Sequence, residues 1–228
     1  MAENNLSISA IIMFVAFIIV FSEGMSGKIT GILMGLGGIG VLIAIFTSGY
    51  RMKRFISFIN PWKYATDEGY QLVHSLYAIG TGGLFGVGLG NSKQKALYMP
   101  EPHNDFIFAI ICEELGLIGA IIIISVFLVL IVAGINVAMR AKDKYGRLLA
   151  TGIISVIAVQ VVINIAVVTG SMPVTGVPLP FISYGGTSLV FNLAAIGVLL
   201  NISSQTKTHK DEIQEKIERK RIKSKMNI

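Results

Sequence analysis

The sequence is poor in charged residues and almost free of cysteine. Charged side chains make up 14% of its 228 residues, whereas hydrophobic residues make up 53% and the mean hydropathy is +0.71. This composition excludes an ordinary soluble domain and is typical of a polytopic membrane protein. The single cysteine, Cys112, excludes an intramolecular disulfide and a zinc site built on cysteines. We interpret Cys112 as a small residue that packs between helices.

Proline is scarce as well, and all six prolines lie outside the long apolar segments. A bilayer core needs about 20 apolar residues per helix. The sequence therefore predicts an all-α polytopic membrane protein with a membrane domain over residues 1–203. It has a long outer loop over 48–105 and a re-entrant-like Pro-rich loop over 171–185. The five predicted transmembrane helices cover about 6–22, 29–47, 106–134, 148–170 and 186–202.

The positive charges predict the orientation of the chain in the membrane. No basic residue precedes the first apolar segment, which argues against a signal peptide. Four basic residues lie within 139–147, so this loop is predicted to be cytoplasmic, together with the basic tail over 204–228. The loops 48–105 and 171–185 are then extracytoplasmic. The net charge of +6 is thereby assigned to contacts with membrane lipids, and no nucleic acid partner is expected.

The densest group of polar side chains lies directly before the third apolar segment. Pro100 and Pro102 restrict the backbone there and favour a stiff turn. Two acids further along, Glu113 and Glu114, lie about two turns into the apolar run and are predicted to face protein or water. A stripe of small residues on the side of Asp105 would let another helix approach closely; it consists of Ala109, Cys112, Gly116, Gly119 and Ala120. We interpret the polar group, Glu101, His103, Asn104 and Asp105, as a reaction or binding site at one membrane face.

Several residues have two interpretations that the sequence leaves open. Asp105 is either the N-cap of the following helix or a general base. The basic residues Arg51, Lys53 and Arg54 either attract a lipid-linked diphosphate or extend along the membrane interface. Gln160 and Asn164 share a helix face, where hydrogen bonds between helices are favoured over substrate contact.

The glycine-rich stretch 80–90 lacks the Gly-Lys-Ser/Thr ending of a phosphate-binding loop. It is predicted to let backbone segments pack closely instead. His74, which precedes it, is interpreted as a structural histidine that forms a hydrogen bond. The Pro-rich loop 171–185 contains apolar residues without charge, and irregular backbone of this kind survives at membrane depth only when protein or a cavity surrounds it. We therefore expect this loop to form one wall of the site.

Two blocks of the sequence resemble the signatures of the SEDS family, the FtsW, RodA and SpoVE proteins of cell-wall synthesis. The first is Pro100-Glu-Pro-His-Asn-Asp-Phe-Ile-Phe-Ala109, followed by Glu113-Glu-Leu-Gly116. The second is Pro173-Val-Thr-Gly-Val-Pro-Leu-Pro-Phe-Ile-Ser-Tyr-Gly-Gly-Thr-Ser188. A third stretch, Gly88-Leu-Gly-Asn-Ser-Lys-Gln-Lys95, is more similar to the division and sporulation branch. The similarity covers about Leu6 to Ser203, and Asn104 replaces the Thr or Ser expected in the family.

The resemblance implies the C-terminal part of a lipid II-polymerising peptidoglycan glycosyltransferase. Asp105 matches the family's catalytic aspartate, and a divalent cation (Mg²⁺ or Mn²⁺) or basic side chains would stabilise the departing diphosphate; no organic cofactor is expected. The implied partners are a class B penicillin-binding protein and N-terminal helices of the same fold, because the chain begins where the sixth of about ten family helices would begin. The supporting or substrate-binding residues are Glu101, His103, Asn104, Lys95, Arg51, Arg54, Ser183, Tyr184, Gly185 and Gly186.

Two other functions are considered beside the glycosyltransferase. The first is a transporter that flips the same lipid intermediate, and the second is a non-catalytic membrane scaffold for a penicillin-binding protein. Transporters usually hold their polar site near the membrane midplane in broken helices. Here the polar group around Asp105 lies at the outer mouth of a helix, which favours chemistry at that face.

Overall fold

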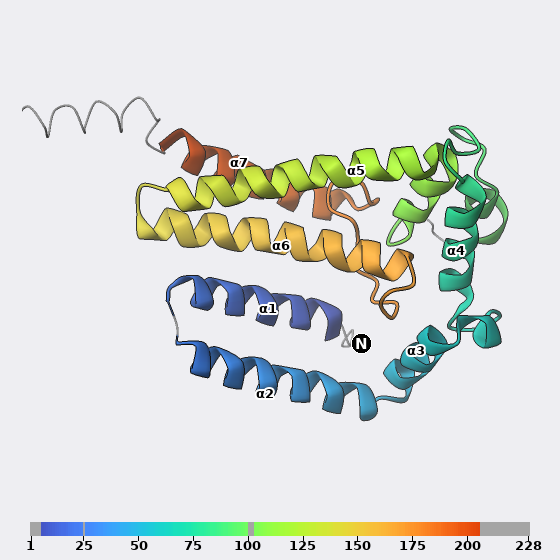
Figure 1. Cartoon of the computed structure of the whole chain (residues 1–228), viewed down its shortest axis with the longest axis horizontal. Helices are drawn as coiled ribbons and strands as arrows, with labels where there is room; N and C mark the ends of the chain where they lie inside the picture. Colours follow the sequence, from blue (N-terminus) through green and yellow to red (C-terminus); the bar gives the residue numbers. More distant parts are fainter. Residues whose placement is uncertain (1–5, 25, 100–102, 206–228) are drawn as a thin grey trace, which may run out of the picture.

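The computed structural model of the chain describes residues 6–24, 26–99 and 103–205, and these residues form helices without any strand. Figure 1 shows their arrangement. A short 3-10 turn (Pro61–Tyr64) and a single π-helical turn (Gln94–Tyr98) lie between the longer helices. These longer helices are α1 (Leu6–Ser22), α2 (Gly27–Phe46), α3 (Gly49–Ile59), α4 (Tyr70–Gly82), α5 (Ile107–Arg140), α6 (Lys144–Val168) and α7 (Gly186–Gln205).

All five predicted apolar segments are helical, which confirms the all-α membrane class. Among the described residues, α5, α6 and α7 are long and apolar enough to cross a membrane, and a shorter apolar helix covers Ser7–Ser22. The connection between α5 and α6 is shorter than predicted, because α6 begins at Lys144 rather than at 148. Asp143 explains the early start, since its Oδ2 accepts a hydrogen bond from the Gly146 amide at 3.0 Å and so caps the helix.

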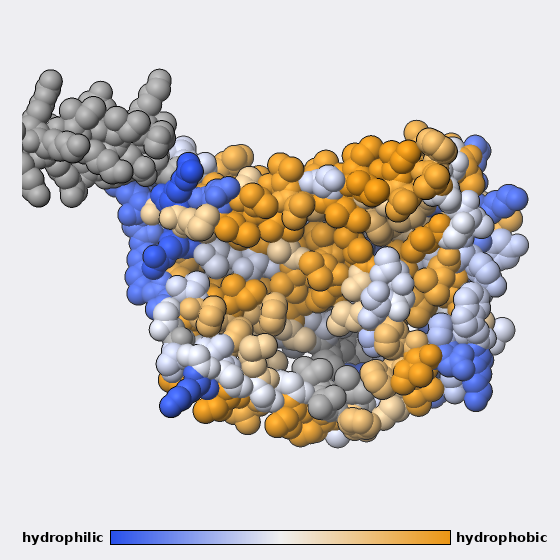
Figure 2. Space-filling view, in the orientation of Figure 1, coloured by the Kyte–Doolittle hydropathy of each residue, from blue (hydrophilic) through white to orange (hydrophobic). Residues whose placement is uncertain are grey.

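The two predicted outer segments meet at one end of the bundle. α5 packs against α6, and α1 packs against α6, while α3 and α4 lie across the end where α5 begins and α6 finishes (Figure 1). The connection over 141–143 and the end of α7 lie at the opposite end. Hydrophilic residues gather at these two ends, with hydrophobic residues between them (Figure 2). This distribution fits helices that cross an apolar layer.

The packed centre lies between α4, α5 and α6, whereas α2 is mostly open. Phe108, Ile157 and Val168 are almost completely buried in this centre. In the described part of the chain, α2 contacts α1 and α3. Its glycines Gly31 and Gly35 have no neighbour within 4 Å of an added Cβ. One face of α2 is therefore available to lipid or to further helices.

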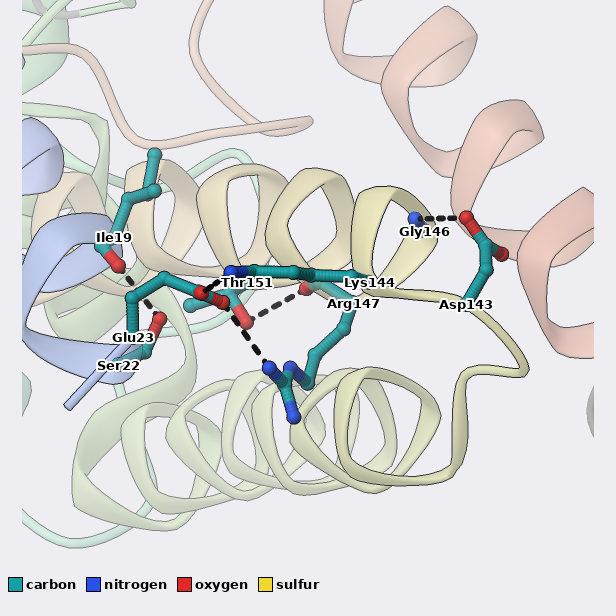
Figure 3. Close-up of polar contacts among 8 residues, drawn as sticks. All are labelled: Ile19, Ser22, Glu23, Asp143, Lys144, Gly146, Arg147 and Thr151. Carbon is teal, nitrogen blue, oxygen red and sulfur yellow. Dashed lines mark hydrogen bonds and ion pairs between the residues drawn. The ribbon is translucent and has the colours of Figure 1, made fainter.

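An ion pair joins α1 to the start of α6 at the end away from α3 and α4 (Figure 3). Glu23, directly after α1, accepts a hydrogen bond from Arg147 Nη2 at 3.1 Å and pairs with Lys144 Nζ. The Glu23 side chain is 22% exposed, while those of Lys144 and Arg147 are 70% and 47% exposed. The pair thus holds two helix ends together at the membrane surface.

This ion pair predicts a stability contribution that acid removes. The hydrogen bond from Lys144 and, less strongly, that from Arg147 lower the pKa of the Glu23 carboxyl. A carboxyl whose pKa is lower in the folded state stabilises that state above its unfolded pKa, and the contribution disappears as the pH falls through the folded pKa. Glu23→Gln should therefore lower the melting temperature in detergent slightly at pH 7, because exposed pairs contribute little, and not at all in strong acid.

The matched control is Asp143→Asn, which keeps a side-chain oxygen for the cap of α6. It should leave the melting temperature near that of the parent at both pH values. A loss in Glu23→Gln that is equally large at neutral and strongly acidic pH would contradict the ion-pair explanation.

Candidate functional site

Asp105 lies in the turn that enters α5, directly before the N-cap position of this helix. The N-cap position is Phe106, whose side chain makes no cap hydrogen bond. Both interpretations of the Asp105 carboxylate, helix cap and general base, stay predictions. Asp105 and Asn104 are half-buried, whereas His103 is exposed. Glu101, which the sequence also assigned to the site, lies outside the described residues.

The Pro-rich loop packs directly on this turn. The Tyr184 amide donates to the His103 carbonyl at 2.8 Å. Gly176 has a φ of +71°, and a Cβ added to it would lie 3.9 Å from Asp105 Oδ2, so its backbone stands beside the Asp105 carboxylate. Val177 and Leu179 of the same loop are buried. The loop therefore lies against the Asp105 turn and forms a wall next to its side chain.

Asn164 of α6 joins the two segments. Its Nδ2 donates to the Asp105 carbonyl at 2.7 Å and to the Val177 carbonyl at 2.8 Å. The sequence predicted hydrogen bonds between helices for this residue. In the structure its partners are loop carbonyls, because irregular backbone in an apolar surrounding requires donors that a helix would otherwise supply.

The other predicted residues of the second block have mainly structural positions. Ser183 Oγ accepts a hydrogen bond from the Leu179 amide at 2.7 Å and closes the loop. The Tyr184 side chain is 81% exposed, so only its backbone amide contacts the Asp105 turn. Gly185 and Gly186 lead into α7, which begins at Gly186.

Among the predicted basic residues, Arg54 bonds to the Pro-rich loop, whereas Lys53 and Lys95 lie elsewhere. Arg54 on α3 donates from Nη1 to the Val174 carbonyl of the Pro-rich loop at 3.2 Å, and its guanidinium lies 4.7 Å from the centre of the Tyr50 ring. Lys53 is instead 3.9 Å from Glu68 at an exposed position. Lys95 is exposed as well. The structure therefore brings Arg54, and not these lysines, to the loop beside Asp105.

A large apolar cavity ends at the Pro-rich loop. It has a volume of about 1360 Å³ and lies between α1, α2, α3 and α6. Its charged lining residues are Arg51 and Arg54, and Thr175 and Gly176 of the loop also line it. Asp105 itself does not line the cavity, but its carboxylate lies next to Gly176, one of the lining residues. The cavity therefore combines an apolar lining and two guanidinium groups with a loop that borders a carboxylate. Such an arrangement fits a ligand with a long apolar chain and an anionic head group.

The helix that follows Asp105 is broken, which the sequence did not predict. Gly116 has φ 69° and ψ −167° inside α5. The segment after α4 fills the break: the Leu117 amide donates to the Gly83 carbonyl at 2.9 Å, and the Val87 amide donates to the Glu113 carbonyl at 2.9 Å. The predicted stripe of small residues is therefore approached closely by the last residue of α4, Gly82, at Cys112 and by the irregular segment after α4 at Gly116.

The approach is close enough to require glycine. A Cβ added to Gly82 would lie 2.0 Å from the Cys112 carbonyl oxygen, and one added to Gly86 would lie 2.2 Å from that of Glu114. This confirms that the glycine-rich stretch permits close backbone packing.

Glu113 is the acceptor that holds this segment in place. Its side chain is 2% exposed and accepts hydrogen bonds from the Ser92 hydroxyl, from the Lys93 amide at 3.2 Å and from the Thr81 hydroxyl at 3.5 Å. This confirms that the acid faces protein. Its partners could not be named from sequence, because they come from a separate irregular segment. His74 is structural as predicted, with its Nδ1 2.7 Å from Gln94 Oε1.

The expected divalent cation finds no ready site in the described part of the chain. No group of three or more His, Cys, Asp or Glu side chains there could hold a metal ion. Mg²⁺ is usually held by one or two carboxylates together with substrate phosphates and water, so the divalent cation stays a prediction. We therefore derive no chemical step through a metal and argue the site from its own side chains.

The sequence and the fold of this chain match those of known proteins of one family. Residues 1–208 match the family model of the FtsW/RodA/SpoVE proteins, described as cell cycle proteins. The chain is 54% identical over 173 residues to stage V sporulation protein E of Bacillus subtilis, covering 75% of this chain and 47% of that protein. It is 44% identical over 207 residues to the probable peptidoglycan glycosyltransferase FtsW of Geobacter sp. (strain M18), covering 90% and 56%. The chain thus spans about half the length of these relatives.

Solved structures agree with the family match. One chain of a peptidoglycan synthase complex, described as coordinating polymerization and crosslinking, is similar with a TM-score of 0.72 and 26% identity. The match covers 90% of this chain and 57% of that one. The rod shape determining protein RodA of Thermus thermophilus is similar with a TM-score of 0.58 and 26% identity, covering 90% and 52%.

The contacts of Glu113 with the 83–93 segment predict that substitution of Glu113 lowers stability more than substitution of its neighbour Glu114. Glu113→Gln replaces one acceptor oxygen by an NH₂ donor that would face other donors, and leaving such buried groups unsatisfied costs about 1–3 kcal/mol. It should lower the thermal stability of the chain in detergent and speed proteolysis of the 83–93 segment.

Glu114→Gln is the matched control. Glu114 is half-buried, and its Oε1 has no partner among the described residues. We expect a smaller loss of stability than for Glu113→Gln. Equal losses for the two variants would show that the Glu113 contacts do not hold the segment.

Proposed function

The chain belongs to the FtsW/RodA/SpoVE family of cell cycle proteins, and from this premise we propose that it carries the Asp105 site of a lipid II-polymerising peptidoglycan glycosyltransferase of bacterial cell division or sporulation. One observation carries the proposal. The Asp105 carboxylate stands beside Gly176, where the apolar cavity with Arg51 and Arg54 ends. In this proposal the Asp105 carboxylate serves the acceptor sugar, the apolar cavity serves the lipid tail, and Arg51 and Arg54 serve the diphosphate.

The proposed reaction uses each of these groups once. The 4-hydroxyl of the acceptor sugar forms a bond to the anomeric carbon of the donor, and Asp105 accepts the hydroxyl proton as general base. The bond between the anomeric carbon and the diphosphate oxygen breaks, and the oxygen leaves with the electron pair. Arg51 and Arg54 stabilise the negative charge of the departing lipid diphosphate. The apolar cavity accommodates the lipid chain.

The broken helix α5 is a feature that favours the alternative function of a lipid transporter, because transporters often have broken membrane helices. In transporters, freed backbone groups at such a break bind the substrate or a coupling ion. Here the Gly83, Glu113 and Glu114 carbonyls accept hydrogen bonds from the Leu117, Val87 and Gly88 amides. The break is therefore occupied by the protein itself, and the transport function has no binding site at this point.

We further propose that the chain works with protein partners in the membrane. A structural neighbour belongs to a peptidoglycan synthase complex, which supports a class B penicillin-binding protein as one partner. The open face of α2 supports a second set of partners, namely the membrane helices of the half of the family fold that this chain does not match. In this arrangement the Asp105 end is extracytoplasmic and the 141–143 end is cytoplasmic, in a multi-pass plasma membrane protein.

The orientation is tested by labelling with an impermeant thiol reagent in intact cells whose wall has been permeabilised. In a Cys112→Ala background, Asn91→Cys should react and Lys144→Cys should react only after cell lysis, because both original residues are exposed at opposite ends. Labelling of Lys144→Cys but not of Asn91→Cys in intact cells would reverse the orientation.

The catalytic proposal is tested with Asp105→Asn in a chimera in which this chain replaces the matching segment of the Bacillus subtilis relative. Asparagine keeps the shape of the side chain but cannot accept the hydroxyl proton. Loss of a general base lowers a rate typically about 10²–10⁴-fold. The variant should reach the membrane normally in cells. After purification it should polymerise lipid II more slowly by a factor in this range, while Asp105→Glu retains part of the activity.

Glu114→Gln serves as the control for a changed acid in the same helix, and its folded fraction should polymerise at the parent rate. If Asp105→Asn polymerises lipid II nearly as fast as the parent chimera, Asp105 is not the base.

A further inference from the structure

Asn164 is an amide inside an apolar helix bundle. Its side chain is 1% exposed, and it lies in α6, which is long and apolar enough to cross a membrane. Both contacts of its Nδ2 are backbone carbonyl oxygens, those of Asp105 and Val177. Since carbonyl oxygens only accept hydrogen bonds, the NH₂ group must face them, and the orientation of the amide is determined by its neighbours.

The Asn164 amide has one favourable and one unfavourable effect on the folded state. Asn164 Oδ1 is buried and has no hydrogen-bond partner among the described residues. A buried acceptor without a partner destabilises the folded state, and polar contacts between membrane helices contribute modestly. A leucine of similar size would avoid the unsatisfied oxygen, but it would remove the donor of the Asp105 and Val177 carbonyls, and backbone in an apolar surrounding requires such donors. The contribution of the amide must therefore lie in what its two donated hydrogen bonds hold together.

The two carbonyls belong to the two segments that border the Asp105 side chain. Asp105 is 59 residues from Asn164 in sequence, and Val177 is 13 residues from it. Gly176, the neighbour of Val177, is the loop residue whose added Cβ would lie 3.9 Å from Asp105 Oδ2. The Asn164 side chain thus bonds to both backbone segments: the turn that carries the Asp105 carboxylate and the loop that lies beside this carboxylate.

Other contacts support these segments, but none of them replaces Asn164. The Tyr184 amide contacts the His103 carbonyl, two residues before Asp105. Arg54 contacts the Val174 carbonyl, three residues before Val177. Each of these contacts anchors one side at some distance from the carboxylate. Asn164 bonds to the Asp105 backbone itself, and catalytic groups must be held within about 0.5 Å of the productive geometry.

We propose that Asn164 is a positioning residue that sets the Asp105 carboxylate against the Pro-rich loop for proton transfer. The inference rests on the proposed function of Asp105. Asn164 itself does not line the cavity. Its loss therefore moves the base without removing a substrate-binding group.

The kinetic test uses Asn164→Leu and Asn164→Asp in the chimera described above. Leucine removes both hydrogen bonds at similar volume, and a misplacement of about 1 Å lowers a rate up to about 10²-fold. We expect kcat of Asn164→Leu to fall by a factor of this order with KM unchanged. Asn164→Asp should also be slow, because a carboxyl group offers at most one hydrogen-bond donor for the two carbonyls and none when it is ionised. Gln160→Leu, one turn earlier on the same helix, removes an amide without those hydrogen bonds and should keep the parent kcat.

A second measurement does not depend on activity. Hydrogen exchange of the chimera in detergent, followed by mass spectrometry, reports the backbone protection of 103–106 and 174–184. Asn164→Leu should accelerate exchange in both segments, and Gln160→Leu in neither. This comparison stands even if Asp105→Asn polymerises at the parent rate, so the failure of the proposed base is distinguishable from the failure of the coupling.

Two results would overturn the inference. One is unchanged exchange in both segments of Asn164→Leu. The other is a folded Asn164→Leu protein with the kcat of the parent, or one that loses activity only in proportion to its folded fraction. Either would reduce Asn164 to an ordinary packing residue.

Discussion

Some backbone segments of this protein are not helical although they lie in an apolar surrounding. The structure depends on hydrogen-bond donors and acceptors that satisfy the peptide groups of these segments. An unpaired peptide group there is costly, so each irregular segment needs partners from the protein. The 83–93 segment finds them in the backbone of the broken helix α5 and in Glu113. The Pro-rich loop finds them in Asn164, Arg54 and Ser183. The polar residues inside the bundle are therefore the devices that keep two loops folded against helices.

This requirement also explains where the candidate chemistry lies. The Pro-rich loop presents a glycine beside Asp105, which leaves room next to the carboxylate. Arg54 is bonded to the same loop and lines the apolar cavity together with Arg51. The Pro-rich loop thus lies beside the carboxylate, bonds to one of the two guanidinium groups and lines the apolar cavity. The proposed transfer of a sugar from a lipid diphosphate uses each part of this arrangement.

Much of the fold was predictable, because apolar runs and the positions of proline determine helices and loops almost independently of context. The five helices, the Asp105 turn at a helix mouth and the Pro-rich loop beside it all follow from such local patterns. The break at Gly116 was not predicted, since a glycine in an apolar run is compatible with a continuous helix until another segment competes for its hydrogen bonds. The partners of Glu113 and Asn164 were missed because they come from loops distant in sequence. For the same reason, sequence could not separate Arg54, which bonds to the loop, from Lys53, which pairs with Glu68.

The most direct test of the central claim is a structure of the chimera with a non-reactive donor and an acceptor disaccharide bound. The quantity to measure is the distance between the Asp105 carboxylate and the acceptor 4-hydroxyl. The account predicts about 2.6–3.2 Å, or contact through one water molecule, with the Asn164 amide still bonded to the Asp105 and Val177 carbonyls. A bound acceptor whose hydroxyl contacts another side chain, with Asp105 turned away, would contradict it.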